Sequence, residues 1–205
     1  INFNNGGSDT IGSWNPGEYI SGIFENATKF NQNISKWNLT GTSSMCEMFK
    51  DATSFNQDIS KWNVSKVTNM EFMFYSARAF NQPLDKWNVS NVSDMQFMFC
   101  GAYTFNQDIS QWNVSWVTTM EGMFNNARAF NQPIGQWNVS QVTDMNRMFS
   151  GASKFNQPIG EWDVSQVTNM DYMFYNAKEF NQNISDWMIL KSPSMTEMFD
   201  SRYTH

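Results

Sequence analysis

Hydrophobic and polar positions along the chain follow a 25-residue cycle. In one cycle, residues 55–79, the apolar positions are Phe55, Ile59, Trp62, Val64, Val67, Met70, Met73, Phe74 and Ala77. The tryptophans keep the same step without an insertion, at Trp37, Trp62, Trp87, Trp112, Trp137, Trp162 and Trp187. A pattern that returns at a fixed period of this length predicts a repeat architecture, in which each unit buries its apolar face against its neighbours.

Two periodicities follow one another within each unit. Residues 62–64 alternate between apolar and polar, as a short strand does, whereas the apolar positions 70, 73, 74 and 77 lie on one stripe of a helix. Thr68 and Glu71 have the spacing of a capping box, which predicts a helix that begins near residue 69. Each unit is therefore expected to hold one short strand and one short helix.

These elements predict an α/β repeat fold: a right-handed solenoid similar to leucine-rich repeats, with a parallel sheet on its concave face. Residues 1–29 are interpreted as a degenerate N-terminal repeat or cap, because Phe3, Trp14, Ile20 and Phe24 fall on the repeat positions once the spacing is relaxed. Residues 30–205 form seven repeats, and all units are expected to make one continuous domain. The repeat bounds are 30–54, 55–79, 80–104, 105–129, 130–154, 155–179 and 180–204.

Composition and charge exclude several classes of function. The chain carries 13 Lys and Arg against 19 Asp and Glu, a net charge of -6, which argues against a nucleic-acid partner. It contains no apolar run near the roughly 18 residues that a membrane-spanning helix needs. We therefore expect neither a nucleic-acid interface nor a membrane span in this chain.

The sequence offers no catalytic or metal-binding group. The single histidine is His205, so neither a Ser-His-Asp nor a Cys-His pair can be assembled, and zinc would need three or four Cys or His ligands. Cys46 and Cys100 lie two units apart and at different repeat positions, too far apart for a disulfide. We expect a protein without enzymatic activity, cofactor or metal, with both thiols reduced and partly buried.

One repeat position is expected to tie the units together. We call the set of equivalent positions, one from each unit, a column. The Asn that follows the first Phe of each unit, with the Gln after it, forms a column pair that begins at Asn31 and Gln32. Stacked amides of this kind are typical of side-chain ladders, so we predict hydrogen bonds from unit to unit along this pair.

Columns that vary are the candidates for partner recognition, because the invariant ones encode the fold. The column before each Trp changes from basic through neutral to acidic, in the order Lys36, Lys61, Lys86, Gln111, Gln136, Glu161 and Asp186. Neutral drift on a solvated face explains such a column. The alternative is a charge gradient that orients a long partner or supports end-to-end self-association.

Aromatic residues off the apolar stripe are the second set of candidates. Phe72, Tyr75 and Phe97 could form one aromatic patch, and Tyr172 with Tyr175 another. They either cover the core between neighbouring units or provide an exposed contact surface. Trp116 is the best single candidate for a partner contact, because its column is otherwise Gly, Lys, Asn or Gln. Packing on a neighbouring loop is the alternative for this residue.

The motif F-N-Q-x-I-x-x-W-N-V-S-x-V-T-x-M-x-x-M-F, over residues 30–204, resembles the 25-residue unit of the BspA-like leucine-rich repeat surface proteins. The resemblance implies a surface-displayed protein without enzymatic activity, linked with adhesion or protein binding. We therefore predict a module for protein binding or cell adhesion, at a cell surface or in extracellular matrix. A structural accessory subunit or spacer of a larger assembly is the alternative, and binding of a glycan is the third possibility.

Overall fold

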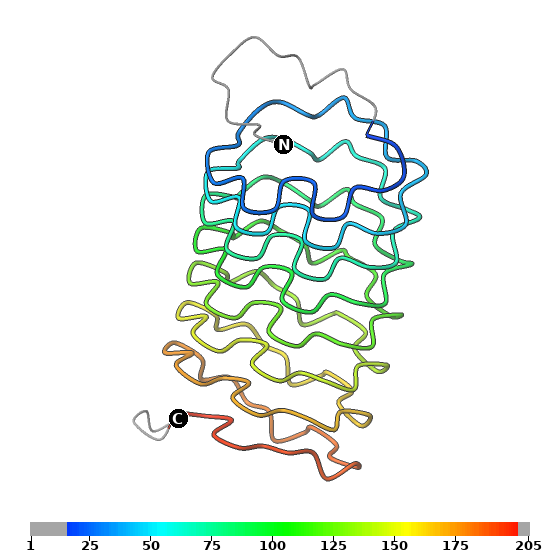
Figure 1. Ribbon diagram of the computed structural model, residues 1–205. Helices are drawn as coiled ribbons and strands as arrows, with labels where there is room; N and C mark the ends of the chain where they lie inside the picture. Colours follow the sequence, from blue (N-terminus) through cyan, green and yellow to red (C-terminus); the bar gives the residue numbers. More distant parts are fainter. Residues whose placement is uncertain (1–15, 201–205) are drawn as a thin grey trace.

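A computed structural model describes residues 16–200 and shows a chain wound into stacked coils, one for each 25-residue repeat (Figure 1). Each coil lies directly on the next, from the blue N-terminal end to the red C-terminal end. The described residues contain no helix, and extended pairing is limited to isolated parallel bridges. These bridges are Ser44–Asn69, Asn69–Asp94, Asp94–Thr119, Thr119–Asp144, Asp144–Asn169, Asn169–Ser194 and Phe174–Phe199. The predicted α/β unit, with one strand, one helix and a parallel concave sheet, is therefore wrong.

Each coil is instead a succession of tight turns. The amide of Met73 donates to the carbonyl of Met70 (3.2 Å), and the amide of Ala77 donates to that of Phe74 (3.0 Å). The same bond closes the turns 59–62, 64–67 and 77–80. In each of these turns the first and last residues are apolar and buried, and the two middle residues lie towards solvent. A chain of such turns produces apolar residues three apart, the spacing that predicted a helix.

The backbone angles of the turns exclude a helix directly. The third residue of the turn 70–73, Phe72, has φ of 53°, and the third residue of the turn 74–77, Ser76, has φ of 54°. A positive φ at this position is the signature of a type II turn and is incompatible with a right-handed helix. Gly122 (55°) and Gly151 (69°) occupy these two positions in later coils, where glycine suits the left-handed conformation.

Many of the amides that do not close a turn bond to a neighbouring coil. The amide of Phe72 donates to the carbonyl of Gln96 in the next coil (2.9 Å). The side chain of Thr68 donates to the carbonyl of Ser43 in the preceding coil (3.3 Å). Thr68 therefore does not cap a helix, and the predicted capping box with Glu71 is wrong. Hydrogen bonds between coils replace the ladders that helices and sheets would supply.

The predicted ladder of Asn and Gln is confirmed. Asn31 Oδ1 accepts bonds from the amide of Asn56 (2.9 Å) and from Gln57 Nε2 (3.0 Å) in the next coil. The arrangement recurs along the stack up to Asn181 and Gln182. A second series of bonds comes from the tryptophans: the indole N–H of Trp62 donates to the carbonyl of Ile34 in the preceding coil (3.1 Å).

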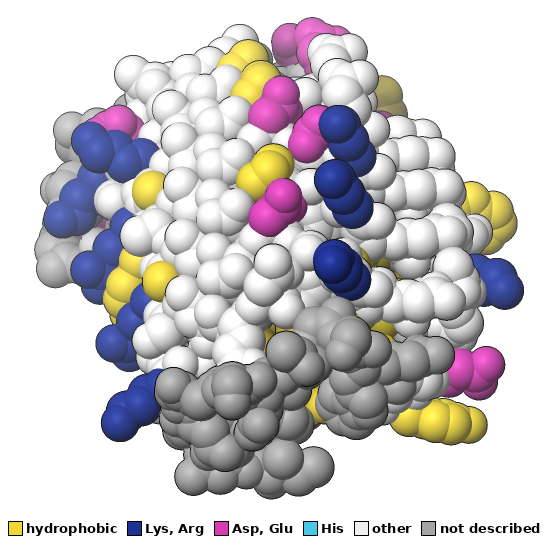
Figure 2. Space-filling model, turned by 90° about the horizontal axis from the view of Figure 1, so that it is seen from above, with side chains coloured by type: hydrophobic (Ala, Val, Ile, Leu, Met, Phe, Trp, Pro, Cys, Tyr) yellow, Lys and Arg dark blue, Asp and Glu magenta, His cyan; other side chains and the backbone are white. Residues whose placement is uncertain are grey.

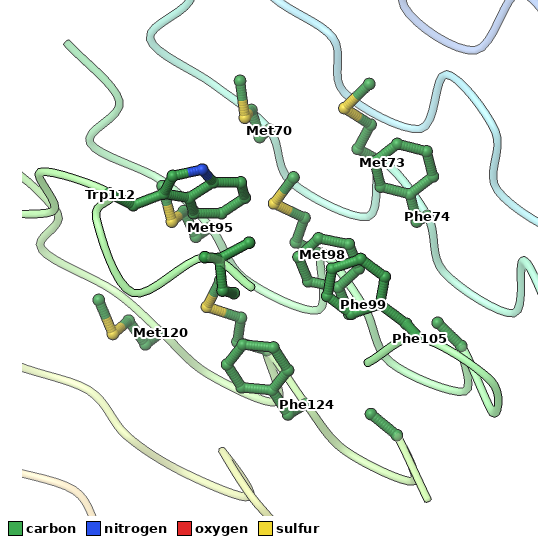
Figure 3. Packing of buried hydrophobic residues seen from close by; sticks show 14 of the residues in the cluster. Met70, Met73, Phe74, Met95, Met98, Phe99, Phe105, Trp112, Met120 and Phe124 are labelled. Carbon is green, nitrogen blue, oxygen red and sulfur yellow. The ribbon is translucent and has the colours of Figure 1, made fainter. Parts of the chain in front are cut away.

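The core is built from rows of identical side chains, one from each coil (Figure 3). Phe74 stacks on Phe99, its equivalent in the next coil, at a centroid distance of 5.5 Å and on Phe80, six residues further along the chain, at 4.1 Å. The methionines of each M-x-x-M-F motif from Met45 to Met173 are fully buried beside these rings. Each buried side chain contributes about 1.5–3 kcal/mol, and aromatic pairing adds about 0.5–1.5 kcal/mol per pair.

Both ends of the described stack depart from the regular pattern. In residues 16–29, Ile20 and Phe24 are buried in the positions of Met45 and Phe49, and the amide of Phe24 donates to the carbonyl of Met48 (3.0 Å). The other residues assigned to this degenerate repeat, Phe3 and Trp14, lie outside the described residues. In the last coil three apolar side chains that follow Trp187 are exposed: Met188 (63%), Ile189 (41%) and Leu190 (62%).

Two buried side-chain atoms of the described residues have no hydrogen-bond partner, Thr42 Oγ1 and Asn146 Oδ1, and removal of the first is expected to stabilise the stack. Thr42 is fully buried, its Oγ1 makes no hydrogen bond, and the next five coils hold Val in the same column. Thr42→Val should raise the free energy of unfolding by about 1–2 kcal/mol, because an unpaired hydroxyl is replaced by a methyl group. Urea unfolding measures the change. The reverse change, Val92→Thr, is the matched control and should destabilise; an unchanged or lower stability of Thr42→Val would contradict the prediction.

Candidate functional site

The residues predicted to contact a partner all occupy the middle of a turn. The column before each Trp, which we call the column of graded charge, lies in the turns equivalent to 59–62, and Trp116 lies in the turn 114–117. The aromatic residues of the two patches lie in the turns equivalent to 70–73 and 74–77. Middle positions point outward because both ends of a turn are buried. The surface of the stack is therefore a set of parallel columns, each contributed by one turn position.

Trp116 is the most exposed tryptophan of the described chain, with 70% of its surface open, whereas the core tryptophans expose 8% or less. It borders a groove of about 520 Å³. The groove is lined by Gly41, Ser43, Lys66, Thr68, Asn91, Ser93 and Trp116. Asn91 Nδ2 donates to the carbonyl of Ser65 (2.6 Å), which holds the amide in place. The groove thus combines one large indole face with an ammonium group, an ordered amide and hydroxyl groups.

The residues of the first aromatic patch pack on one another. Phe72 stacks on Phe97 at 5.0 Å and meets Tyr75 edge-on at 5.6 Å, and all three side chains are half-buried. The ring of Phe97 lies over Gly122, where a Cβ atom would overlap it. The ammonium of Lys50 lies 5.6 Å from the centre of the Phe72 ring. These residues come together as predicted, but they contact mainly one another.

The second aromatic patch is part of a polar groove. Tyr172 and Tyr175 meet edge-on at 5.9 Å, and the guanidinium of Arg147 lies 4.9 Å from the centre of the Tyr172 ring. The groove measures about 470 Å³. Its lining consists of Asn125, Asn126, Arg147, Ser150, Gly151, Tyr172, Tyr175, Asn176 and Glu197. Half-burial of both tyrosines again gives them a packing role beside any contact role.

The column of graded charge is exposed along its whole length. Lys36, Lys61, Lys86, Gln111, Gln136, Glu161 and Asp186 are all on the surface. None of the charged members forms an ion pair with another described residue. The column therefore presents positive charge at one end of the stack and negative charge at the other.

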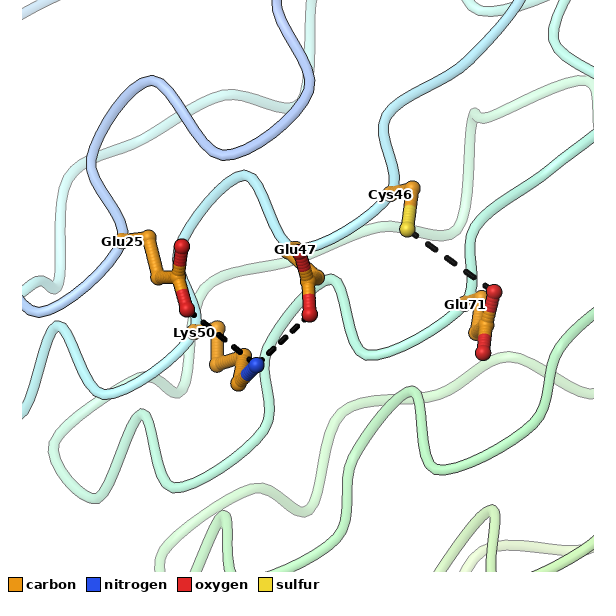
Figure 4. A network of polar contacts seen from close by, with 5 residues as sticks. All are labelled: Glu25, Cys46, Glu47, Lys50 and Glu71. Carbon is orange, nitrogen blue, oxygen red and sulfur yellow. Dashed lines mark hydrogen bonds and ion pairs between the residues drawn. The ribbon is translucent and has the colours of Figure 1, made fainter.

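A small polar network joins the first coils (Figure 4). Lys50 forms ion pairs with Glu47 (2.6 Å) and Glu25 (3.1 Å). Cys46 Sγ lies 3.8 Å from a carboxylate oxygen of Glu71. Burial raises the pKa of the Cys46 thiol to about 11, with a further contribution from the charge of Glu71. Both cysteines are free, Cys46 partly buried and Cys100 buried, as predicted.

One charged edge was missed by the sequence analysis. The ring of Tyr103 lies between two guanidinium groups, that of Arg78 at 5.4 Å and that of Arg128 at 4.4 Å from the ring centre. All three residues are middle residues of turns and share one column, each one coil apart. The signal was therefore present in the repeat spacing. We call these three residues the Arg–Tyr–Arg edge.

Within residues 16–200 no group of three or more Cys, His, Asp or Glu is arranged to hold a metal ion. The same residues include no helix that could cross a membrane. The lone histidine, His205, lies outside the described residues. The expectation that the protein lacks catalytic activity stays a prediction.

Coils that follow the sequence repeat, joined through nearly identical junctions, define this molecule as a repeat protein. The chain belongs to a family described as Mycoplasma protein of unknown function, DUF285, whose model matches residues 2–112 and again residues 98–204. No curated protein and no solved structure matches the chain. The family match agrees with a repeat protein.

The carboxylate beside Cys46 is expected to control the reactivity of that thiol. In a Cys100→Ala background, Glu71→Gln should lower the pKa of Cys46, because a negative charge that disfavours the thiolate is removed. The rate of alkylation by iodoacetamide at pH 9 should rise several-fold, since only the thiolate reacts. A distant carboxylate, changed by Glu179→Gln, is the control and should leave the rate unaltered. Identical rate–pH profiles for Glu71→Gln and its parent would disprove the effect.

Proposed function

We propose that the chain is a binding module without enzymatic activity and that a protein partner contacts the Trp116 groove. The observation that carries the proposal is the 70% exposure of Trp116 in a column that is otherwise small or polar. A large aromatic side chain in water forfeits about 1.5–3 kcal/mol of burial, and exposed aromatics are enriched at interface hot spots. A partner that covers the indole would recover this free energy.

The surroundings of Trp116 suit a protein chain. Asn91 and the hydroxyl groups of the groove can pair with backbone groups, and Lys66 can pair with a carboxylate. The column of graded charge lies on the turn that precedes the Trp116 turn in the chain, so both columns run along the stack from coil to coil. A partner with acidic residues towards the N-terminal coils and basic residues towards the C-terminal coils would be oriented by this gradient. Display at a cell surface or in extracellular matrix is proposed on the resemblance of the repeat to BspA-like proteins.

A second candidate function, a structural accessory subunit, is favoured by the last coil. Met188 stands in a column that is Asn or Asp in the six preceding units, and Leu190 in one that is Ser or Thr. Both columns are solvent-facing, so their change to apolar residues is unrelated to the core. Apolar residues at positions of this kind are typical of a contact within an assembly.

Two variants, each restoring the usual residue of its column, separate these functions. Trp116→Gln removes the exposed indole, and Met188→Asn with Leu190→Ser removes the apolar surface of the last coil. After capture from an extract of the source organism, the captured protein is purified and its affinity measured for each folded variant. The binding module predicts a loss of at least about tenfold for Trp116→Gln alone. Loss for the Met188/Leu190 variant alone supports the structural subunit, and equal affinities of all three proteins contradict both.

Quenching of tryptophan fluorescence by acrylamide locates the contact independently. Trp116 should dominate the quenchable fraction, because the other described tryptophans are buried. Addition of the purified partner should protect this fraction in the unmodified protein. Trp116→Gln, in which the fraction is absent from the start, is the control. Binding without protection would place the partner elsewhere.

A further inference from the structure

The Arg–Tyr–Arg edge is a cationic site on an acidic protein. The chain has a net charge of -6, yet Arg78 and Arg128 are exposed and have no carboxylate partner among the described residues. On one side, beyond a buried Ala in each coil, the next positions are Ser76, Gly101 and Asn126, and on the other side the adjoining positions are Ala79, Thr104 and Ala129. None of these six residues is acidic, and Asp51, in the column of Ser76 one coil before Arg78, forms no ion pair with either arginine.

The two guanidinium groups are held in place. Both contact the ring of Tyr103, at 5.4 and 4.4 Å, and such cation–π contacts orient the planar group and reduce its hydration. The hydroxyl of Thr104, the residue after Tyr103, donates to the carbonyl of Arg78 (2.8 Å) and so ties the backbones of these two coils together. An ordered guanidinium binds carboxylate or sulfate groups in a bidentate manner.

The charges repeat along the stack axis. Arg78 and Arg128 are separated by two coils, and two coils further along the same column Lys178 is again exposed. Along the row that contains Phe74, the ring centroids of successive coils are 5.5–5.8 Å apart, which is close to the length of one sugar ring in a linear polysaccharide. Figure 2, in which the stack is seen from above, shows one group of dark-blue side chains along the left edge of the molecule, with hydrophobic side chains among them, and a second group nearer the middle.

We infer that the Arg–Tyr–Arg edge binds a linear acidic polysaccharide that lies along the stack, with one anionic group at each arginine. A polymer whose acidic sugar recurs every second unit would place its charges in register with alternate coils. Guanidinium groups from the preceding and the following coil lie 5.4 and 4.4 Å from the centre of the Tyr103 ring, where they compete with a nucleic-acid base for stacking on this ring. Three residues after each member of the edge comes a residue of the Asn ladder: Asn81, Asn106 or Asn131. Their Oδ1 atoms accept the ladder hydrogen bonds, and their Nδ2 groups can donate to sugar hydroxyls. This site is separate from the Trp116 groove and independent of its proposed partner.

The test compares two variants of equal charge. Immobilised heparin, a sulfated polysaccharide, and alginate, a carboxylated one, are offered to the intact chain, to Arg78→Gln/Arg128→Gln and to Lys61→Gln/Lys86→Gln. We expect the intact chain to bind at least one polymer at low salt, and the affinity to fall as salt rises. The arginine variant should bind at least about tenfold more weakly, and the lysine control should change less than about twofold. Tyr103→Leu, which keeps both charges, should also weaken binding because the guanidinium groups lose their support.

Three outcomes would overturn the inference. The first is absence of binding to either polymer at low salt. The second is an equal loss for the arginine and lysine variants, which would indicate attraction by charge alone. The third is binding to phosphatidylglycerol vesicles through both arginines without binding to either polysaccharide, which would assign the edge to membrane headgroups. Circular dichroism and urea unfolding are the checks that each variant is folded. None of these outcomes depends on Trp116.

Discussion

The whole structure depends on how the backbone amides of each coil find their partners. No described coil contains a helix or an extended strand, so buried N–H groups are satisfied in two alternating ways. The amide of Met73 closes a turn within its own coil, and the next amide, that of Phe74, bonds to Met98 one coil ahead. Many of the bonds that hold a coil in shape therefore come from its neighbour, and an isolated coil would lose them. The stacked rings of the core and the rows of Asn and Gln reinforce the same register.

The period, the buried columns, the amide ladder and the free thiols could be predicted from the sequence, because each depends only on which residues recur at the repeat period. The local conformation could not be predicted from the hydrophobic pattern. Apolar residues at 70, 73, 74 and 77 describe a helical stripe and equally the ends of two tight turns. The deciding signal was Gly122 and Gly151 in the middle of the supposed helix, where glycine is unfavourable in a helix but suits a positive φ. Phe72 takes the same conformation without glycine, so no single coil carries the full signal.

The candidate surface could be predicted in part for a related reason. Trp116 stood out because its side chain differs from the rest of its column, and a difference in type is visible in the sequence. The Arg–Tyr–Arg edge depends on three residues that look ordinary one at a time and gain meaning only when coils are placed side by side. Burial separated the two groups of aromatics: Trp116 is exposed, whereas Phe72 and Phe97 lie against each other and over a glycine.

The uniform junction between coils also bears on how a gene for such a protein can change. Loss or gain of one residue within a coil would displace every donor from its acceptor in the neighbouring coil. Loss or gain of one whole repeat would join two surfaces that already match, because each coil presents nearly the same atoms to the next. Recombination between the similar coding segments can therefore lengthen or shorten the stack in whole coils. The outward columns then change independently, so new surfaces can arise on an unchanged core.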